Sequence, residues 1–370
     1  MVNGQWSESA NPLISDPLIS NLWYNCPTLR RILQVTSVVL LTVFFLGLFL
    51  WKSNLTDVWR IMTATSPWWL ASAFAVNWMT LIFRTVRWRV LLASPEPPRF
   101  YPTFFANTTG YMLSTVLPIR AGDVARPALL ARRTNVRFAE ALGTVLTERI
   151  LDLISILALF IWFAAMRWNA FPNNTGVVHG GAIGCTIVLI ALLSFLVGLY
   201  FFGGVVRRLH EWIGRILPKR FREPWMKFFD AFAKTLAITE RPRDFFTVIF
   251  ATAGVWLCLT AQYWLVFIAV HHPLPFDSTF FISAVTTIGV AIPTPGGVGG
   301  FHKLCQWALT SFYGFDIDTS VATALLLHLV GTLPVVITGV VLFAREGLRW
   351  RDLRRAAEDV PSDNEMGSQS

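Results

Sequence analysis

The chain alternates between long apolar stretches and shorter polar segments. Six stretches are apolar over most of a membrane's thickness, and they lie at 32–51, 68–88, 139–166, 178–202, 245–270 and 320–343. A transmembrane helix takes about 20 predominantly apolar residues. The pattern therefore predicts an all-α fold, a polytopic helical membrane protein with about six full spans.

Two further apolar stretches, 100–118 and 276–293, are interrupted by Pro, Gly, Thr and Asn. Irregular backbone is tolerated at membrane depth only where protein surrounds it or where it lines a wet cavity. We therefore expect re-entrant or broken segments, although full crossing of both would raise the count to eight. Each half of the chain then reads span, span, broken segment, span. Three crossings per half predict two halves of opposite orientation, as in an inverted repeat.

Arginine and lysine are distributed unevenly among the predicted loops. They are frequent in 120–137, 207–243 and 345–355 and scarce in 52–67 and 271–275. Positive residues are enriched in cytoplasmic loops, so the pattern predicts that both termini are cytoplasmic. No basic cluster precedes an apolar core at the start of the chain, so no signal peptide is predicted.

Three segments follow from this reading. They are a polar cytoplasmic tail at 1–30, a transmembrane domain at 31–345, and a cytoplasmic tail at 346–370 that is basic and then disordered. None of them has room for a soluble catalytic domain, so a transporter is favoured over an enzyme. The sequence leaves the oligomeric state open.

The composition supports a membrane protein and argues against other classes. Hydrophobic residues make up 54% of the chain and charged residues only 14%, whereas soluble domains carry about 25% charged residues. The net charge of +9 does not indicate nucleic-acid binding, because the basic residues cluster between apolar runs. The four cysteines have no Cys-x-x-Cys spacing, so we predict neither a disulfide framework nor a metal site and expect no cofactor.

The first cluster of chemically distinctive residues follows the first broken stretch, at 117–126. Pro118 and Gly122 are expected to end a helix and allow a tight turn, and Asp123 to cap the next helix. Arg120 and Arg126 would then flank a helix N-terminus, a position suited to a phosphate. The alternative is an ordinary basic loop that sets topology.

The second cluster is Glu148, Arg149 and Asp152, at the start of an apolar run that is too short to span by itself. The predicted helix must therefore draw some of these charges into the membrane's inner edge. Glu148 and Asp152 share a helix face, and Arg149 can pair with Asp152. Charged groups at membrane depth indicate function, whereas the alternative is an interfacial salt bridge that fixes the depth of the helix.

The third cluster, at 292–303, contains too many helix breakers to continue a helix; they are Pro293, Pro295, Gly296, Gly297, Gly299 and Gly300. We expect this break to lie at membrane depth and to line a cavity or to be buried in protein. His302 follows directly and could titrate near neutral pH. The alternative for His302 is a structural histidine that is hydrogen-bonded to the loop.

Taken in order, these clusters resemble the flippase-like family that includes the transmembrane region of lysylphosphatidylglycerol synthases. The matching pieces are Arg87-Trp88, the Pro-x-Arg-x-Gly-Asp-x-x-Arg stretch at 118–126, the Glu-Arg-x-x-Asp stretch at 148–152 and Pro-Gly-Gly-x-Gly at 295–299. The resemblance covers about 30–345. It implies a protein of a bacterial or archaeal cytoplasmic membrane that moves a lipid or assists an enzyme acting on one.

The chain departs from the family pattern at two positions. His302 stands where the family usually has a glutamate, and His328 stands where its last span often has an arginine. Both changes alter the charge of the expected cavity, so the headgroup is expected to differ from the usual one. The soluble synthase domain of some members is not seen, so aminoacyl transfer is not expected.

The resulting hypothesis is a lipid translocase whose partner is a phospholipid or lipid-linked precursor. The residues expected to bind its phosphate, or to hold the groups that do, are Arg87, Arg120, Asp123, Arg126, Glu148, Arg149, Asp152, His302 and His328. The alternative is an accessory or catalytic subunit for glycosyl or aminoacyl transfer onto a membrane lipid. It would require a lipid-modifying enzyme in the same membrane, or a carboxylate-bound metal in this chain.

Overall fold

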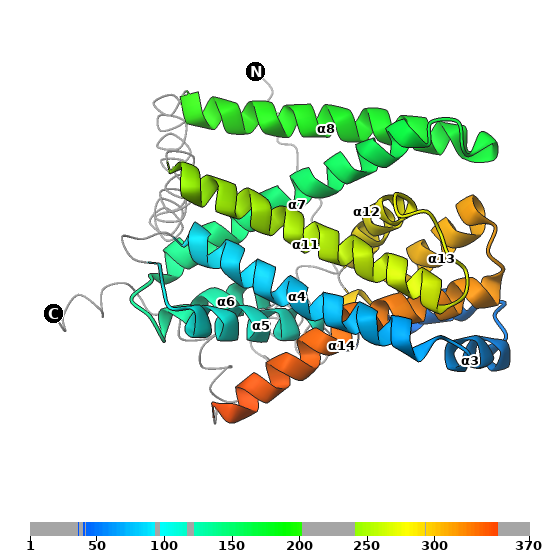
Figure 1. Cartoon of the computed structure of the whole chain (residues 1–370), viewed down its shortest axis with the longest axis horizontal. Helices are drawn as coiled ribbons and strands as arrows, with labels where there is room; N and C mark the ends of the chain where they lie inside the picture. The colour runs from blue at the N-terminus through cyan, green and yellow to red at the C-terminus, as the bar shows by residue number, and fades with distance from the viewer. Residues whose placement is uncertain are drawn as a thin grey trace, which may run out of the picture.

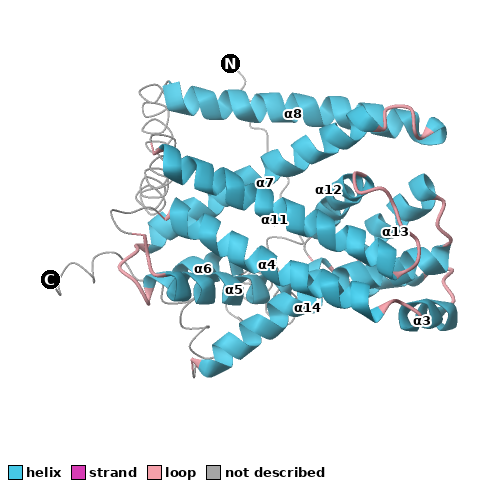
Figure 2. Ribbon diagram, viewed as in Figure 1, coloured by secondary structure: helices cyan, strands magenta, loops and turns pink. Residues whose placement is uncertain are grey.

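The protein is helical throughout the part of the chain that the computed structural model describes, namely 36, 40, 42–92, 97–116, 122–201, 241–292 and 294–346 (Figure 2). Pro118, Arg120 and Pro293 lie outside the described residues, as do both predicted tails apart from Glu346. The predicted all-α membrane fold is confirmed.

The long helices run roughly along the long axis of the molecule (Figure 1). Their bounds are α3 Leu55–Thr63, α4 Pro67–Leu91, α5 Phe100–Val116, α6 Gly122–Ala131, α7 Phe138–Met166, α8 Thr175–Phe201, α11 Pro242–Ala269, α12 Ser278–Ala291, α13 Gly300–Tyr313 and α14 Ile317–Arg345, with short 3-10 turns η2 Pro172–Asn174 and η4 Pro295–Gly297.

Four of the described helices are long and apolar enough to cross a membrane: α7, α8, α11 and α14. They match four of the predicted spans. The helix α4 has 25 residues but is not among these four, since it carries Asn77 and three arginines. Of the predicted first span, residues 42–50 are helical and most of the remainder lies outside the described residues.

Local sequence signals explain where the helices begin. Pro67 and Pro242 occupy the first helical positions of α4 and α11, where the missing N–H removes no helical hydrogen bond. Asp316 caps α14 by accepting a hydrogen bond from the backbone N–H of Thr319 at 2.9 Å. Asn54 caps α3 in the same way through the backbone N–H of Thr56.

The two interrupted stretches form helical hairpins that enter the bundle from opposite ends. In Figure 1, α5 and α6 lie at the left, whereas α12 and α13 lie at the right. The two hairpins meet inside the bundle, where α5 packs against η4. The predicted broken segments are therefore confirmed, and neither crosses the bundle as a continuous helix.

The packing of the helices repeats between the two halves of the chain. The contacts of α5 with α14 correspond to those of α12 with α7, and α6 with α7 corresponds to α13 with α14. Likewise α4 with α5 corresponds to α11 with α12, while α4 and α11 pack against each other. Exchanging the two halves maps each of the other pairs onto its counterpart and the α4–α11 pair onto itself, as a two-fold internal repeat requires.

Both hairpins are closed by a pair of glycines that lets their two arms touch. A Cβ added at Gly122 would overlap the carbonyl oxygen of Gly110, and a Cβ added at Gly300 would overlap that of Gly289. Close approach of helix backbones through glycine is typical of membrane proteins. A close backbone contact between two glycines therefore occurs in both halves, although the surrounding residues differ.

Replacing Gly300 by alanine should destabilise the second hairpin, because its Cβ meets backbone and the side chain of Ile292. We expect a loss of about 1–3 kcal/mol, typical of overpacking, seen as a lower melting temperature of the purified protein. The matched control is Gly184→Ala on α8, where nothing lies within 4 Å of the added Cβ. Equal melting temperatures for the two variants would contradict the close approach.

Arginine-rich ends of the helices gather on one side of the bundle. The C-terminal ends of α4 and α14 and the N-terminal ends of α7 and α11 all lie at the left in Figure 1. These ends carry Arg89, Arg345, Arg137 and Arg243. The fold therefore places together the basic segments that the sequence distributes over the chain.

Candidate functional site

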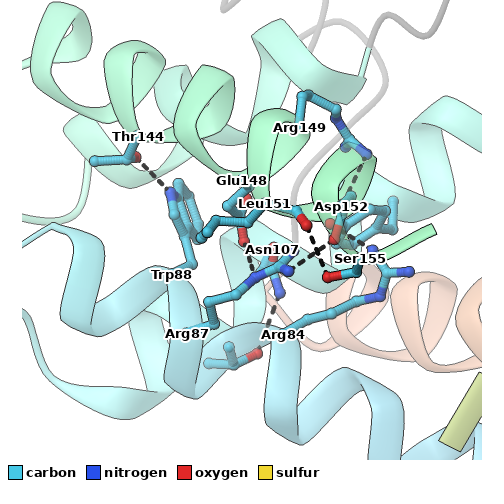
Figure 3. A network of polar contacts seen from close by, with 12 residues as sticks. Arg84, Arg87, Trp88, Asn107, Thr144, Glu148, Arg149, Leu151, Asp152 and Ser155 are labelled. Atoms are coloured by element: carbon cyan, nitrogen blue, oxygen red, sulfur yellow. Dashed lines mark hydrogen bonds and ion pairs between the residues drawn. The ribbon is translucent and has the colours of Figure 1, made fainter. Parts of the chain in front are cut away.

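Side chains of α4 and α7 meet in a buried ionic cluster next to the first hairpin (Figure 3). Arg87 on α4 contacts both carboxylates of α7: its Nε lies 3.2 Å from Glu148 Oε1 and its Nη1 lies 2.7 Å from Asp152 Oδ1. Glu148 and Asp152 are four residues apart, so they face the same way. The predicted shared face of these carboxylates is therefore confirmed.

The ion pairs continue onto α6 and form a chain of alternating charge, and the backbone of α6 joins the two ends of this chain into a ring. Glu148 Oε2 lies 2.5 Å from Arg126 Nη2, and Asp152 Oδ2 lies 3.5 Å from Arg149 Nη1. Arg149 Nη2 in turn donates to Asp123 Oδ1 at 2.8 Å. Arg126 and Asp123 stand three residues apart on α6, so the ring returns to the helical turn from which it started.

This charge ring, formed by Arg87, Arg126, Arg149, Asp123, Glu148 and Asp152, fastens the first hairpin to α4 and α7. Its inner members are inaccessible: Arg87 and Glu148 are 0% exposed and Arg126 is 1% exposed. Charges so far from water are tolerated only when they are paired and hydrogen-bonded. Arg126 accordingly also donates to Asn107 Oδ1 at 3.0 Å.

A cavity of about 480 Å³ opens beside the ring, between α4, α11, α14 and the tips of the two hairpins. Its position where the hairpins meet is typical of substrate sites in repeat-built transporters. The polar side chains that line it are Asn77, Thr80, Arg84, Tyr111, Ser114, Thr115, Asp123, Arg149, Gln262, Tyr263, Thr294, His328 and Thr332.

Arg84 gives this region an excess of positive charge. It lies one turn before Arg87 on α4 (Figure 3), donates to the Tyr111 hydroxyl at 2.8 Å and stacks on the Tyr111 ring at 4.6 Å. It forms no ion pair within 4 Å among the described residues, and Asp152 is the carboxylate that interacts with it electrostatically from farther away. The ring contains three arginines and three carboxylates, so Arg84 raises the formal charge of the region to +1.

Several buried polar atoms in the cavity wall have no hydrogen-bond partner in the described part of the chain. They are Asn77 Oδ1, Ser114 Oγ, Arg149 Nε and Thr294 Oγ1. Natural proteins rarely leave such atoms unsatisfied. The wall therefore offers both donors and acceptors to a polar group in the cavity.

The two histidines that the sequence singled out, His302 and His328, lie together at the second hairpin. Their rings are 4.6 Å apart, and His328 Nε2 lies 2.9 Å from the carbonyl oxygen of Gly296. His302 is buried and accepts a hydrogen bond from the Gly299 backbone N–H through Nδ1 at 3.2 Å. Gly299 has φ 94°, which disfavours a side chain. A proton on Nδ1 would break this bond, which favours the structural alternative for His302.

The transmembrane region of lysylphosphatidylglycerol synthases is the family whose model matches residues 34–339. The chain belongs to this family. The recognition made from the motifs is thus confirmed, and the match includes both hairpins and the charge ring. Membership supports a lipid-related role in a membrane, since the family is named for its association with a lipid synthase.

Curated relatives of this family member come from archaea. A UPF0104 membrane protein of Methanothermobacter thermautotrophicus is 25% identical over 300 residues, which cover 73% of this chain and 80% of the relative. The UPF0104 membrane protein MJ1078 of Methanocaldococcus jannaschii is 21% identical over 233 residues, which cover 62% of this chain and 92% of the relative. Glycosyltransferase AglD of Haloferax volcanii is 26% identical over 137 residues, covering 36% of this chain and 22% of AglD.

The family motifs meet in two neighbouring places rather than one. The first and second clusters, with Arg87, build the charge ring, whereas the third cluster forms the tip of the second hairpin, which His328 of α14 contacts. Of these, Asp123, Arg149, Gly296, Gly297 and His328 line the cavity. Asp123 does not precede α6 as a cap; it lies in the first turn of the helix and pairs with Arg149.

Among the cavity residues that the sequence did not single out, four carry the site's polar character: Asn77, Arg84, Tyr111 and Gln262. Asn77 and Gln262 stand inside apolar spans, where polar side chains are costly and often functional, and this signal could have identified them. Arg84 stands with Arg87 and Arg89 at the end of the second predicted span, so its sequence position alone indicates a residue that sets topology. Tyr111 had no distinguishing sequence signal.

Proposed function

We propose that this protein translocates a phosphate-bearing lipid across the membrane, with the phosphate bound at Arg84 and Arg149. The observation that carries the proposal is the single excess positive charge beside a cavity inside the bundle. On insertion scales an arginine at the bilayer centre costs about 2.5–3.5 kcal/mol. A phosphodiester has one negative charge and accepts charge-assisted hydrogen bonds from guanidinium, so it balances the excess.

The arrangement of the hairpins supports movement of this lipid. Each hairpin closes the bundle from one end, and Ser114, Thr115, Gly296 and Gly297 at the meeting point all line the cavity. In inverted-repeat transporters the site stays near the midplane while the repeats rock against each other. If the two halves of the protein exchanged conformations, the cavity would open first to one leaflet and then to the other.

Transport by the full-length protein in liposomes tests the proposal. Vesicles contain phosphatidylglycerol with a fluorescent acyl chain, and an impermeant reductant bleaches the outer leaflet, with and without an imposed proton gradient. We expect vesicles with protein to lose the fluorescence that remains protected in protein-free vesicles. Unchanged protection in both conditions, with folded protein present, contradicts a translocase.

The second candidate function is a subunit for glycosyl transfer onto a membrane lipid, favoured by the partial match to AglD. The chain has one Asp-x-Asp sequence, at 316–318. Asp316 accepts from Thr319 N–H at 2.9 Å and Asp318 accepts from Asn54 N–H at 2.7 Å, so both carboxylates serve the start of α14 and its packing. This favours an accessory role over catalysis, and such a subunit would co-purify with a lipid-modifying enzyme.

We further propose that the arginine-rich end of the bundle and both termini face the cytoplasm, as the distribution of positive charge indicates. Single cysteines replace Ala10 or Val360 after the four native cysteines are removed. In intact cells an impermeant maleimide should leave both unlabelled, whereas Thr56→Cys at the opposite end should react. Labelling at position 10 or 360 before permeabilisation contradicts this orientation.

A further inference from the structure

We infer that the cavity selects lipids whose phosphate carries a neutral, hydroxyl-rich headgroup, such as glycerol, inositol or a sugar, over lipids with a cationic headgroup. This inference rests on the proposed function and specifies which class of lipid the cavity accepts. It follows from what surrounds the cavity beyond Arg84 and Arg149.

The first observation is a pair of amides in the cavity wall. Asn77 on α4 donates through Nδ2 to Gln262 Oε1 on α11 at 2.6 Å. Both side chains are almost completely buried, and Asn77 Oδ1 has no partner in the described part of the chain. Amides supply donors and acceptors without charge, so a hydroxyl group satisfies Asn77 without any change in the net charge of the site.

The second observation is the spacing between the amides and the excess charge. Asn77 and Arg84 are seven residues apart on α4, which places them on one helix face about 10 Å apart along the axis. Thr80 and Leu81, which lie between them, also line the cavity. A phosphate at Arg84 therefore leaves room for a headgroup of sugar size that reaches Asn77.

The third observation concerns acidic groups. Asp123 is the one carboxylate among the residues that line the cavity in the described part of the chain, and Arg149 binds it at 2.8 Å. An ammonium or aminoacyl headgroup would find no free counter-ion there and would be repelled by Arg84. Like charges placed together in a desolvated site are disfavoured, so cationic lipids are discriminated against.

Native mass spectrometry of the full-length protein tests this selectivity with four lipids of identical acyl chains. The lipids are phosphatidic acid, phosphatidylglycerol, phosphatidylinositol and lysyl-phosphatidylglycerol. We expect the glycerol and inositol lipids to bind about tenfold more tightly than phosphatidic acid, because their headgroup hydroxyls gain one or two hydrogen bonds. Lysyl-phosphatidylglycerol should bind most weakly.

Variants at Asn77 and Gln262 test whether this amide pair causes the preference for hydroxyl-bearing headgroups. Asn77→Leu should abolish the roughly tenfold preference of the glycerol and inositol lipids over phosphatidic acid, and Gln262→Leu serves if Asn77→Leu does not fold. Asn174→Leu is the matched control, since Asn174 is only partly buried and donates to the backbone carbonyl of Ser311 outside the cavity. An unaltered preference in both amide variants, or preferred binding of the lysyl lipid, overturns the inference. Failure of every anionic lipid to bind would instead refute the proposed function.

Discussion

Glu148→Gln should lower the stability of the folded protein by about 3–5 kcal/mol, the cost of removing one partner from a buried ion pair. Glu148 is completely buried and contacts Arg87 at 3.2 Å and Arg126 at 2.5 Å. The amide keeps the shape of the side chain but removes its charge, so two inaccessible guanidinium groups lose their shared counter-ion. A large fall in melting temperature and in the yield of monodisperse protein is the expected result.

The control for this variant is Glu346→Gln. Glu346 also pairs with an arginine, Arg133, at 2.9 Å, but both side chains are 25% exposed. Exposed ion pairs contribute about 0–1 kcal/mol, so the melting temperature should hardly change. Combining Glu148→Gln with Arg87→Met should cost less than the sum of the single changes. Additive losses would show that the ring does not act as a unit.

Arg84→Gln should reduce the binding of phosphatidic acid and the transport of phosphatidylglycerol about 10- to 100-fold. This reduction is expected because glutamine cannot make the charge-assisted hydrogen bonds of arginine to phosphate. The same change should not reduce the melting temperature, because it leaves every ion pair of the charge ring intact, and Arg84 itself forms no ion pair with a described carboxylate. Loss of ligand binding without loss of stability distinguishes a binding residue from a structural one.

Arg89→Gln is the matched control for Arg84→Gln. Arg89 lies on the same helix but outside the cavity, and its Nε donates to the carbonyl oxygen of Pro98 at 2.6 Å. Transport should remain near that of the unaltered protein. If Arg84→Gln transports as well as Arg89→Gln, the excess charge has no role in lipid binding and the phosphate site must lie elsewhere.

Much of the fold could be predicted from the sequence, because the signals are local. Apolar runs long enough to span lipid predicted α7, α8, α11 and α14, since backbone groups in lipid must satisfy one another within a helix. The helix breakers around Gly122 and Gly296 predicted two interrupted segments for the same reason. The order of segments then predicted an inverted repeat, and the helix contacts do recur in both halves of the chain.

Part of the site was also visible in the sequence. Glu148, Arg149 and Asp152 lie within two helical turns, so their relative placement follows from helix geometry alone. The motifs around them identified the family, which the match over residues 34–339 confirms. Whether these residues bind a lipid phosphate stays a prediction, as does the role of Arg120 outside the described residues.

Only the tertiary structure decided which charges are paired and which is left over. Arg84 and Arg87 look equivalent in the sequence, yet Arg87 is closed into the ring by helices far along the chain, while Arg84 faces the cavity. Asn77 and Gln262 lie 185 residues apart and meet because α4 and α11 pack at the centre of the repeat. Local sequence fixes where helices form in lipid, whereas the partners of polar side chains depend on how the two halves pack.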